Sequence, residues 1–552
     1  MLNGIIFKQA LISGANNIVN HRQEVDALNV FPVPDGDTGT NMSMTLSAAA
    51  RELQVCEQTD IASVSAKAAA ALLRGARGNS GVILSLIFRG ISNGFKGMDS
   101  ADGKALAKAL ELGKESAYKA VMKPTEGTIL TVIRMAAEAV KNTQETDCKV
   151  VLKAAYEAAK DALLKTPEML PVLKQAGVVD AGGQGFIFIL EGMLSVIEDG
   201  KTVEPIETLD KKDNTKSDKS VVAAASGDIK FGYCSEFLIN KEKDAQSNAA
   251  ALKAYLESIG DCVVVVEDDD IIKVHVHSNE PGNVIQAALK CGPLTNIKID
   301  NMRFQHRNAD RGTENAKEEI KPSEQTQAPA EPTKDYGFVS VAAGDGFIEL
   351  FKELGADNIV SGGQTMNPST DDILSAIEAT PARHVFVLPN NKNIIMAAEQ
   401  TVNLADRRVS VLQTKTLTQG VSAMLNFSET EDVETNLLNM MKAAEAVHTA
   451  QVTFAARDSE AFGQKIKKGQ ILGMEDGKIT LVEDDIVNAA YRTARRLAKK
   501  YNASFITVYY GEETDEATAT RLSERLSERF PNIEINVIPG GQPVYYFIIS
   551  VE

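Results

Sequence analysis

Two polar stretches divide this chain and limit what it can fold into. Residues 202–220, which end in LDKKDNTKSDKS, are charged and show no apolar periodicity, and residues 307–335 are polar and contain prolines. Neither stretch can bury enough apolar surface to offset the entropy lost on ordering, so both are predicted to be linkers. A chain of 552 residues is also too long for a single core. The sequence therefore predicts three domains, residues 1–201, 221–306 and 336–552.

The three pieces differ in their apolar patterns. In the first piece, apolar residues recur at helical spacing in 60–74, 103–122, 128–141 and 151–165, which predicts an all-α domain. The middle piece has strand-like runs such as CVVVVED and IIKVHVHS with helical stretches between them, which predicts an α+β domain. The last piece alternates short buried-type strands with helical patterns, which predicts an α/β domain with a largely parallel sheet.

Composition excludes several classes of function. The net charge of −17 argues against binding to nucleic acid or to anionic membranes, because their phosphates would be repelled. No stretch approaches the roughly 18 apolar residues of a membrane-spanning helix, and the N-terminus lacks the apolar region of a signal peptide. The 5 scattered cysteines do not form a disulfide framework. We expect a cytoplasmic protein with reduced thiols.

The most informative motif is NVFPVPDGDTGTNM, residues 29–42. Asp35 and Asp37 are separated by one glycine, so their carboxylates can converge on one point. Hard oxygen ligands at this spacing suit Mg²⁺, which keeps several waters and bridges to substrate phosphates. Further candidates for contacts to metal or phosphate are Asn29, Thr38, Gly39 and Asn41. The alternative is a turn whose Asp, Gly and Thr residues serve backbone geometry alone.

Three more glycine-rich loops precede predicted helices in the same piece: RGARGNSG (74–81), KPTEGTIL (123–130) and VVDAGGQG (178–185). Backbone N–H groups at a helix start bind anions, so the loops together predict a composite nucleotide site, although each alone is explained as a cap or turn. The candidate nucleotide-binding residues are Gly78, Asn79, Ser80, Gly81, Thr125, Gly127, Thr128, Asp180, Gly182 and Gly183. There is no GxxxxGK[ST] motif and no HRD/DFG pair, which excludes P-loop enzymes and protein kinases.

A second candidate site lies in the middle piece. His275 and His277 flank Val276, and residues two apart on a strand share one face. Cys234 lies on an earlier strand-like run. Two imidazoles and one thiolate form a zinc set with three protein ligands and one open position. Two half-exposed histidines beside a buried cysteine, without metal, are the alternative.

Polar residues also follow two predicted strands of the last piece. Loops at the carboxyl ends of parallel strands are where α/β sheets usually bind ligands, and turns with structural glycine and asparagine are the alternative. The residues concerned are Ser361, Gly362, Gly363, Gln364, Thr365, Asn367, Asn390 and Asn391.

These motifs resemble a known family. PDGDTGTNM, GNSG, PTEGT and DAGGQG are similar to the nucleotide-binding L subunit (DhaL) of dihydroxyacetone kinase, and the whole chain resembles the bacterial fatty acid kinase catalytic subunit. IKVHVHSNEPG, VSGGQTMNPST, VLPNNKN and GGQPVYYFIIS extend the resemblance to the end of the chain. It implies an eight-helix barrel closed at one end by Mg-ATP or Mg-ADP, with Asp35 and Asp37 as catalytic metal ligands. L subunits use three aspartates, whereas Asn29 stands near the first position here, which leaves the number of Mg²⁺ ions open.

The resemblance also implies an activity. A kinase of this family would transfer phosphate from ATP to a fatty acid presented by a DegV-type fatty-acid-binding protein, giving an acyl phosphate for phospholipid synthesis. ATP, Mg²⁺ and Zn²⁺ are the implied cofactors, with zinc on Cys234, His275 and His277. The last piece would be DegV-like and would dock the carrier. A small-polyol kinase of the dihydroxyacetone type and a nucleotide-sensing regulatory scaffold remain alternatives, and the sequence leaves a homodimer open.

Overall fold

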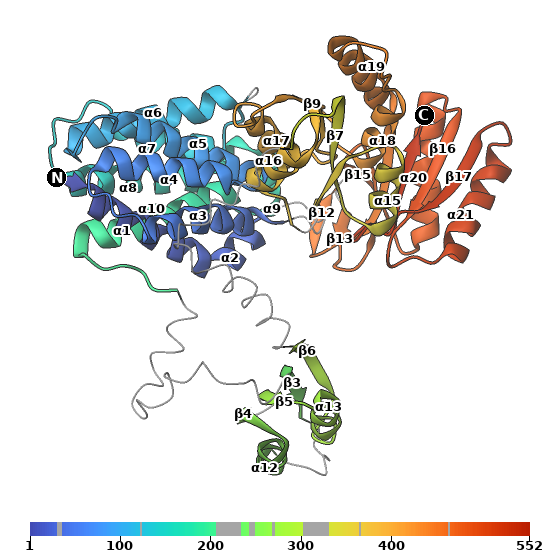
Figure 1. Cartoon of the computed structure of the whole chain (residues 1–552), viewed down its shortest axis with the longest axis horizontal. Helices are drawn as coiled ribbons and strands as arrows, with labels where there is room; N and C mark the ends of the chain where they lie inside the picture. The colour runs from blue at the N-terminus through green and yellow to red at the C-terminus, as the bar shows by residue number, and fades with distance from the viewer. Residues whose placement is uncertain are drawn as a thin grey trace. The chain divides into compact units, whose positions relative to one another are not determined.

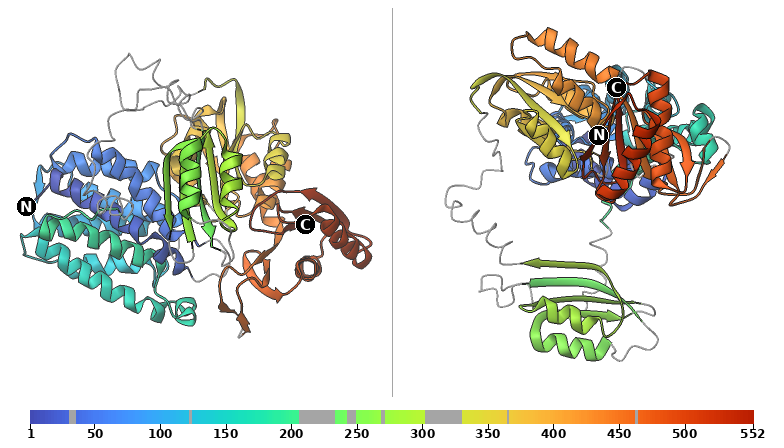
Figure 2. Two further views of the ribbon diagram at one scale, coloured as in Figure 1. Left: turned by 90° about the horizontal axis from the view of Figure 1, so that it is seen from below. Right: turned by 90° about the vertical axis from the view of Figure 1, so that its right-hand side faces the viewer.

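The structure is a computed structural model, and it describes residues 1–29, 36–121, 124–205, 233–241, 249–267, 271–301, 330–363, 366–461 and 464–552. The chain separates into two compact units, one formed by residues 1–212 with 326–552 and the other by residues 213–325 (Figures 1 and 2). Most of the two expected linkers lies outside the described residues. Each unit is described by itself below.

Within its described part, residues 1–205 form ten helices, of which eight are 12 residues or longer. The eight are α1 (Gly4–Asn20), α3 (Thr38–Gln54), α4 (Ile61–Arg74), α5 (Gly78–Gly94), α6 (Gly103–Ala120), α7 (Ile129–Val140), α8 (Cys148–Met169) and α10 (Ala181–Asp199). The short elements are α2 (Arg22–Ala27), α9 (Pro171–Ala176) and the paired strands β1 (Leu2–Asn3) and β2 (Ser100–Ala101). Each long helix packs against the next long helix, and α10 packs against α1, which closes the ring. The predicted eight-helix barrel is confirmed.

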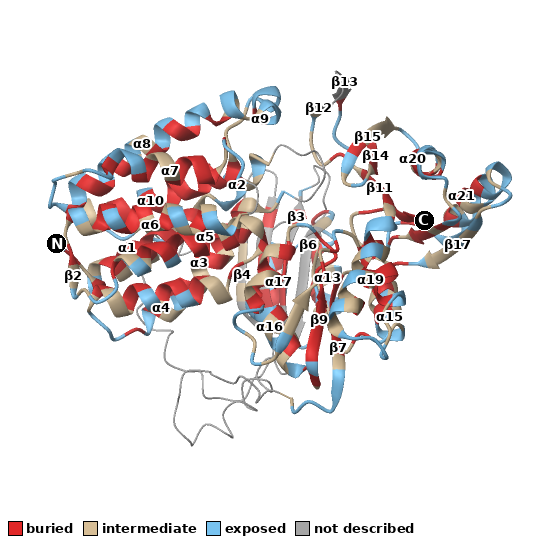
Figure 3. Cartoon of the chain, turned by 90° about the horizontal axis from the view of Figure 1, so that it is seen from above, coloured by how far each residue is buried: buried red, intermediate tan, exposed pale blue. Residues whose placement is uncertain are grey.

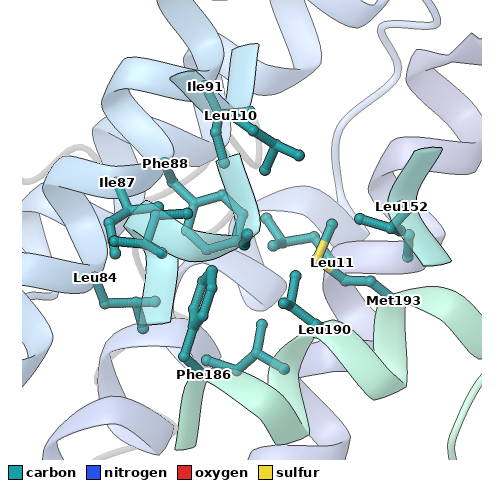
Figure 4. Packing of buried hydrophobic residues seen from close by; sticks show 14 of the residues in the cluster. Leu11, Leu84, Ile87, Phe88, Ile91, Leu110, Leu152, Phe186, Leu190 and Met193 are labelled. Carbon is teal, nitrogen blue, oxygen red and sulfur yellow. The ribbon is translucent and has the colours of Figure 1, made fainter. Parts of the chain in front are cut away.

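Apolar side chains from all sides fill the interior of this barrel. Figure 4 shows Leu11 of α1, Phe88 of α5 and Phe186 of α10 among them, and all three are buried. Contrary to the expectation that no stretch approaches a membrane-spanning helix, α10 is long and apolar enough by length and composition, with a mean hydropathy of 1.2, but 72% of that window is buried inside the protein. This degree of burial identifies α10 as a core helix. Each of its large side chains that is fully buried stabilises the fold by about 1.5–3 kcal/mol.

Side-chain caps mark where most of the long helices begin. Asn3, Asp60 and Asp102 accept hydrogen bonds from the first-turn backbone N–H groups of α1, α4 and α6, and α7, α8 and α10 are capped in the same way. Such a cap contributes about 1 kcal/mol. The N-cap residues of α3 and α5, Asp37 and Arg77, make no such side-chain bond. Helix α3 follows the DGD motif, and helix α5 begins with the GNSG motif.

The second unit is an α+β fold, as predicted. Its strands are β3 (Tyr233–Asn240), β4 (Gly260–Glu267), β5 (Ile271–Ser278) and β6 (Leu294–Asn301), and its described helices are α12 (Ala249–Ile259) and α13 (Pro281–Ala288). The strands form one antiparallel sheet in the order β4-β5-β3-β6. Alternate residues such as Phe237, Val274 and Val276 face Leu256 of α12 and Val284 of α13 in a small core.

The C-terminal part of the first unit begins with a parallel sheet in the order β10-β9-β7-β8. Its strands are β7 (Lys334–Ala342), β8 (Asn358–Ser361), β9 (Ala382–Leu388) and β10 (Arg408–Val411). The helices of this region are α15 (Asp345–Glu353), α16 (Thr370–Ala379), α17 (Ile395–Thr401), α18 (Leu417–Leu425) and α19 (Val433–Ala446). The parallel sheet expected from the alternating pattern is confirmed.

A second sheet follows, and it is mixed rather than parallel. Its order is β15-β14-β11-β18-β16-β17, and only β16 and β17 pair in parallel. The strands are β11 (His448–Phe454), β14 (Ile471–Glu475), β15 (Lys478–Glu483), β16 (Phe505–Tyr510), β17 (Glu534–Pro539) and β18 (Phe547–Val551). The same region contains helices α20 (Ile486–Tyr501) and α21 (Glu516–Arg529) and a separate hairpin of β12 (Ser459–Ala461) and β13 (Gln464–Ile466). The terminal strand β18 inserts between β11 and β16 and pairs antiparallel with both.

The helical barrel and the C-terminal part share a hydrophobic core. Val82 and Leu86 of α5 are buried against Val339 of β7, Val360 of β8 and Ile373 of α16. Buried residues run along α5 and along β7 and β9 (Figure 3). Hydrophobic packing therefore joins the two expected domains 1–201 and 336–552 into one compact unit.

Candidate active site

The glycine-rich loops predicted from the sequence meet at one end of the barrel. At the start of α5, a Cβ on Gly81 would collide with the hydroxyl of Thr45 in α3. At the start of α10, a Cβ on Gly185 would stand 2.7 Å from the sulfur of Met42 in α3. Asp180 joins the start of α10 to the start of α7. Four helix N-termini thus lie together, and each offers backbone N–H groups to an anion.

Asp37, one of the two predicted metal ligands, begins helix α3 without capping it. The cap comes from Asp26 of α2, whose carboxylate accepts from the backbone N–H of Thr40 at 3.1 Å and from its hydroxyl at 2.8 Å. The Asp37 carboxylate is therefore not required for capping. Asp35, the other predicted ligand, lies outside the described residues.

Asn29 holds the same turn. Its side chain lies 2.9 Å from the hydroxyl of Thr38. With the amide turned so that its nitrogen faces this hydroxyl, its oxygen accepts from the backbone N–H groups of Asp37 and Thr38 at 3.3 Å each. Gly39 follows where a Cβ would collide with the backbone carbonyl of Arg22. The turn therefore depends on close packing against α2.

The GNSG loop packs directly against the DGD turn. Gly78 has a φ of +56°, and a Cβ there would stand 2.5 Å from the amide nitrogen of Asn41, which is buried. Asn79 has a buried amide oxygen for which the described part of the chain supplies no partner. Ser80 is half-buried in the first turn of α5. Because Arg77 leaves that turn without a side-chain cap, its N–H groups suit a phosphate.

Asp180 connects the two remaining loops. Its carboxylate accepts from the backbone N–H of Gly183 at 2.7 Å and also from that of Ile129, the first residue of α7. Burial raises the pKa of Asp180 to about 6, although these two hydrogen bonds act in the opposite direction. Gly182 and Gly183 pack against Ile129 and the barrel interior, where a Cβ on Gly183 would stand 2.9 Å from Val132.

The sequence did not single out a polar cluster beside the PTEGT loop. Gly127 has a φ of +83°, and the hydroxyl of Thr128 caps α7 and donates to the carbonyl of Thr125 at 2.8 Å. Glu126 accepts from Thr131 at 2.6 Å and from Arg134 at 2.9 Å. Burial alone would raise the pKa of Glu126, but hydrogen bonds from Thr131, Arg134 and Tyr118 outweigh it and hold the pKa below its usual range. The sequence signal was an acidic residue in the loop before α7, eight positions before an arginine in that helix.

The predicted C-terminal loops lie at the carboxyl ends of their strands, as expected. Asn391 donates to the carbonyl of Gly363 at 2.8 Å, and Asn390 donates to Ser340 and Val341. A pocket of about 690 Å³ lies beside them, and its lining includes Gly362, Gly363, Asn367 and, from the barrel, Arg77. Ser361 also lines it, while Gln364 and Thr365 lie outside the described residues. The pocket thus adjoins the DGD and GNSG end of the barrel.

The residues present fit a magnesium nucleotide. The Asp37 carboxylate is a hard oxygen group of the kind that Mg²⁺ prefers, and the helix does not use it as a cap. Near it, the buried amide oxygens of Asn79 and Asn367 have no partner among the described residues. Such oxygens are costly when unpaired, and a hydrated cation or a bound ligand would satisfy them.

The second unit brings the backbone of the predicted zinc residues together. Cys234 on β3 is the direct cross-strand partner of His277 on β5, and His275 lies two positions along the same strand. These positions alternate with buried residues such as Ser235, Val274 and Val276, so they belong to the sheet face opposite the core. Their side chains lie outside the description, and no group of three or more His, Cys, Asp or Glu able to hold a metal occurs among the described side chains.

Three family models match the chain in consecutive segments. Residues 32–195 match the DAK2 domain, residues 230–309 the middle domain of the FakA-like fatty acid kinases, and residues 337–552 the C-terminal domain of the same family. The Bacillus subtilis protein YloV is 41% identical over 558 residues, which is 100% of this chain and 99% of that protein. An uncharacterized protein of Staphylococcus epidermidis is 36% identical over 100% of this chain and 99% of its own length. The chain belongs to the FakA-like fatty acid kinase family.

Among solved structures, the dihydroxyacetone kinase of C. freundii in complex with AMP-PNP and Mg²⁺ matches 34% of this chain and 33% of its own, with 20% identity and a TM-score of 0.28. A DegV family protein from Thermus thermophilus with bound fatty acid matches 40% of this chain and 99% of its own, with 14% identity and a TM-score of 0.29. Both TM-scores are too low to carry an argument, so the family assignment rests on the family models and the full-length relatives.

Proposed function

We propose that this protein is an ATP-dependent kinase subunit that phosphorylates the carboxylate of a fatty acid presented by a DegV-type carrier protein. The product is an acyl phosphate for phospholipid synthesis, and ATP as the donor implies a cytoplasmic reaction. One observation carries the proposal: the four glycine-rich loops of a FakA-like chain meet at one end of the barrel, around Asp37.

Different residues at this end of the barrel would bind the phosphates, fix the helix starts and hold the metal. The first turn of α5, with Gly78 and Ser80, suits the phosphates of ATP because no side chain caps its N–H groups. Thr128 and Asp180 cap the first turns of α7 and α10 and so fix the two neighbouring helix starts. Magnesium, held by Asp35 and Asp37, would neutralise charge that develops on the phosphates. Positioning and electrostatics provide most of the rate enhancement in this class of reaction.

The chemical step needs no strong base. A carboxylate oxygen of the fatty acid attacks the γ-phosphorus, the bond from that phosphorus to the β–γ bridging oxygen breaks, and ADP leaves with the bond's electron pair. The acceptor is already ionised at neutral pH, so no proton has to be removed. A carrier is required because an acyl chain is poorly soluble and its head group must reach about 3–3.5 Å from the phosphorus.

The proposal includes a zinc ion on Cys234, His275 and His277 in the second unit. The direct cross-strand pairing of Cys234 with His277 supports it, because cross-strand partners have Cβ atoms about 4.5–5.5 Å apart, within the reach of one metal.

The proposal is tested by incubating the purified chain with ATP, Mg²⁺ and either a DegV-type carrier loaded with oleate or dihydroxyacetone. We expect acyl phosphate with the loaded carrier and little with the same concentration of fatty acid alone. Full activity without a carrier would contradict the two-component mechanism. Phosphorylation of dihydroxyacetone alone would favour the small-polyol kinase, and nucleotide binding without transfer to either acceptor would favour the regulatory scaffold.

A further inference from the structure

A short segment of the C-terminal part, residues 366–372, lies against the start of α5. The backbone N–H of Thr370 donates to the carbonyl of Ala76 at 3.0 Å, and Ser369 forms an isolated antiparallel β-bridge with Arg77. The sequence predicts a ligand-binding loop that includes Asn367. The segment brings Asn367 to the DGD turn, 330 positions away along the chain.

Asn367 contacts the predicted magnesium ligand directly. Its amide nitrogen donates to Oδ2 of Asp37 at 2.5 Å and lies 3.4 Å from Oδ1 of Asn41. Only 1% of Asn367 is exposed, and its amide oxygen is buried without a partner in the described structure. The absence of a side chain at Gly78 makes room for this contact, because a Cβ there would stand 3.2 Å from the Asn367 amide nitrogen.

The segment holds Asn367 in place before any ligand binds. Arg77 donates from Nη1 to the carbonyl of Asn367 at 2.8 Å, and its Nη2 lies 3.3 Å from Oδ2 of Asp372. Asp372 in turn forms a capping box with Ser369 at the start of α16. The amide is therefore anchored at its own backbone and at the helix that follows, which is how a preorganised site is built.

A second amide pair joins the same two parts of the unit. Asn79 of the GNSG loop lies 3.4 Å, nitrogen to oxygen, from the side chain of Asn393, which follows β9. The loop after β8 therefore reaches the DGD turn, and the loop after β9 reaches the GNSG loop. Both contacts are made by neutral amide side chains, which add no charge to the site.

We propose that Asn367 is a positioning residue for the Asp37 carboxylate, so that the C-terminal part completes the nucleotide site and does not serve only to dock a partner. The inference rests on the proposed function, because it assumes that Asp37 holds the magnesium of a nucleotide. Carboxylates that bind metals are themselves usually hydrogen-bonded, and this fixes their orientation. Asn367 supplies that bond from outside the DAK2 segment.

The alternative is that Asn367 blocks Asp37 and must leave when metal binds. Acceptor capacity argues against it. An ionised carboxylate has about four lone-pair sites, and the Asn367 amide takes one of them on Oδ2. A hydrogen bond to one lone pair of Oδ2 therefore does not by itself exclude a cation from this carboxylate. The two ideas predict opposite effects when the amide is removed.

The test is equilibrium binding of ADP to the full chain, measured by calorimetry with Mg²⁺ and again with EDTA. Asn367→Leu keeps the volume of the side chain and removes the donor. Asn358→Leu is the matched control, because Asn358 donates to Ala376 and Thr380 within the same C-terminal part, at the start of β8. We expect Asn367→Leu to weaken Mg²⁺-dependent binding roughly 10-fold or more, as loss of a bond to a metal ligand does. Binding in EDTA and the Asn358 variant should match the wild type.

Each outcome decides between the ideas. Equal weakening with and without Mg²⁺, or equal weakening by Asn358→Leu, would mean that Asn367 has a structural role only, and would overturn the proposal. Unchanged or tighter Mg²⁺-dependent binding would overturn it as well, the latter in favour of the blocking contact. Asn367→Ala serves as the second variant if the leucine side chain prevents folding. A wild-type chain that binds no ADP with Mg²⁺ would instead refute the proposed function itself.

Discussion

Replacing Asp180 by asparagine should change how stability depends on pH. Asp180 caps α10 and also accepts from the backbone N–H of Ile129, and burial raises its pKa from 3.8 to about 6. Asparagine retains an oxygen for these bonds and is as good an N-cap as aspartate, but it carries no charge. The variant therefore removes a titration while keeping most of the local structure.

The raised pKa of Asp180 determines whether this residue adds stability at low pH or at high pH. Because the pKa of Asp180 in the folded protein lies above its unfolded value of 3.8, its contribution to stability is fully present below pH 3.8 and is lost as the pH rises through about 6. At 1.36 kcal/mol per pKa unit, the loss amounts to roughly 3 kcal/mol. Asp180→Asn has no such loss, so its stability relative to the wild type should rise by up to that amount between about pH 4 and pH 6.5.

The assay is urea unfolding followed by circular dichroism at 222 nm, with the wild type and the variant measured at each pH. Asp60→Asn is the matched control with the opposite sign. Asp60 caps α4, and a backbone hydrogen bond from Ser63 holds its pKa below the usual range, so its contribution is present above pH 3.8 and is lost as the pH falls. An Asp180→Asn difference that stays constant across this pH range would refute the argument.

Three further predictions concern the metals and the packing. Asp37→Ala should abolish phosphoryl transfer without changing the circular dichroism spectrum, because its side chain caps no helix; unchanged turnover at saturating Mg²⁺ would remove its assignment as a metal ligand. Purified protein should contain about one zinc per chain by elemental analysis, and Cys234→Ser should lose it; zinc-free protein prepared without chelator would contradict the zinc site. Protease sites introduced at the unit boundaries after Lys212 and Gln325 should release the second unit, while residues 1–212 and 326–552 stay together on gel filtration because they share a core; their separation would show that this packing is weak.

Much of the barrel could be predicted from local patterns. Helices α4, α6, α7 and α8 lie close to the segments that apolar periodicity marked, because a helix that buries one face repeats every 3.6 residues. The loops before α5, α7 and α10 were recognisable from their glycines and from the caps Thr128 and Asp180. These signals are short-range features of the sequence, so they can be recognised before the tertiary fold is known.

The contribution of the C-terminal part could not be predicted in this way. Asn367 has no local feature that distinguishes it from any asparagine in a turn, and its contact with Asp37 exists only because α5 packs on the parallel sheet. The mixed order of the second sheet could not be predicted either, because it also depends on tertiary structure. The position of β18 between β11 and β16 depends on where the end of the chain returns, which periodicity does not encode.

The contact between Asn367 and Asp37 has a consequence for a kinase whose acceptor arrives on another protein. If the C-terminal part both docks the carrier and orients a magnesium ligand, carrier binding and nucleotide binding are no longer independent. Any preference of the carrier for one arrangement of residues 366–372 is passed to Asp37 through a single hydrogen bond anchored by Arg77. Linkage requires the coupling to be reciprocal, so bound nucleotide must favour the carrier by the same factor. Such coupling would tighten nucleotide binding when the loaded carrier is docked, which favours transfer of phosphate to the fatty acid.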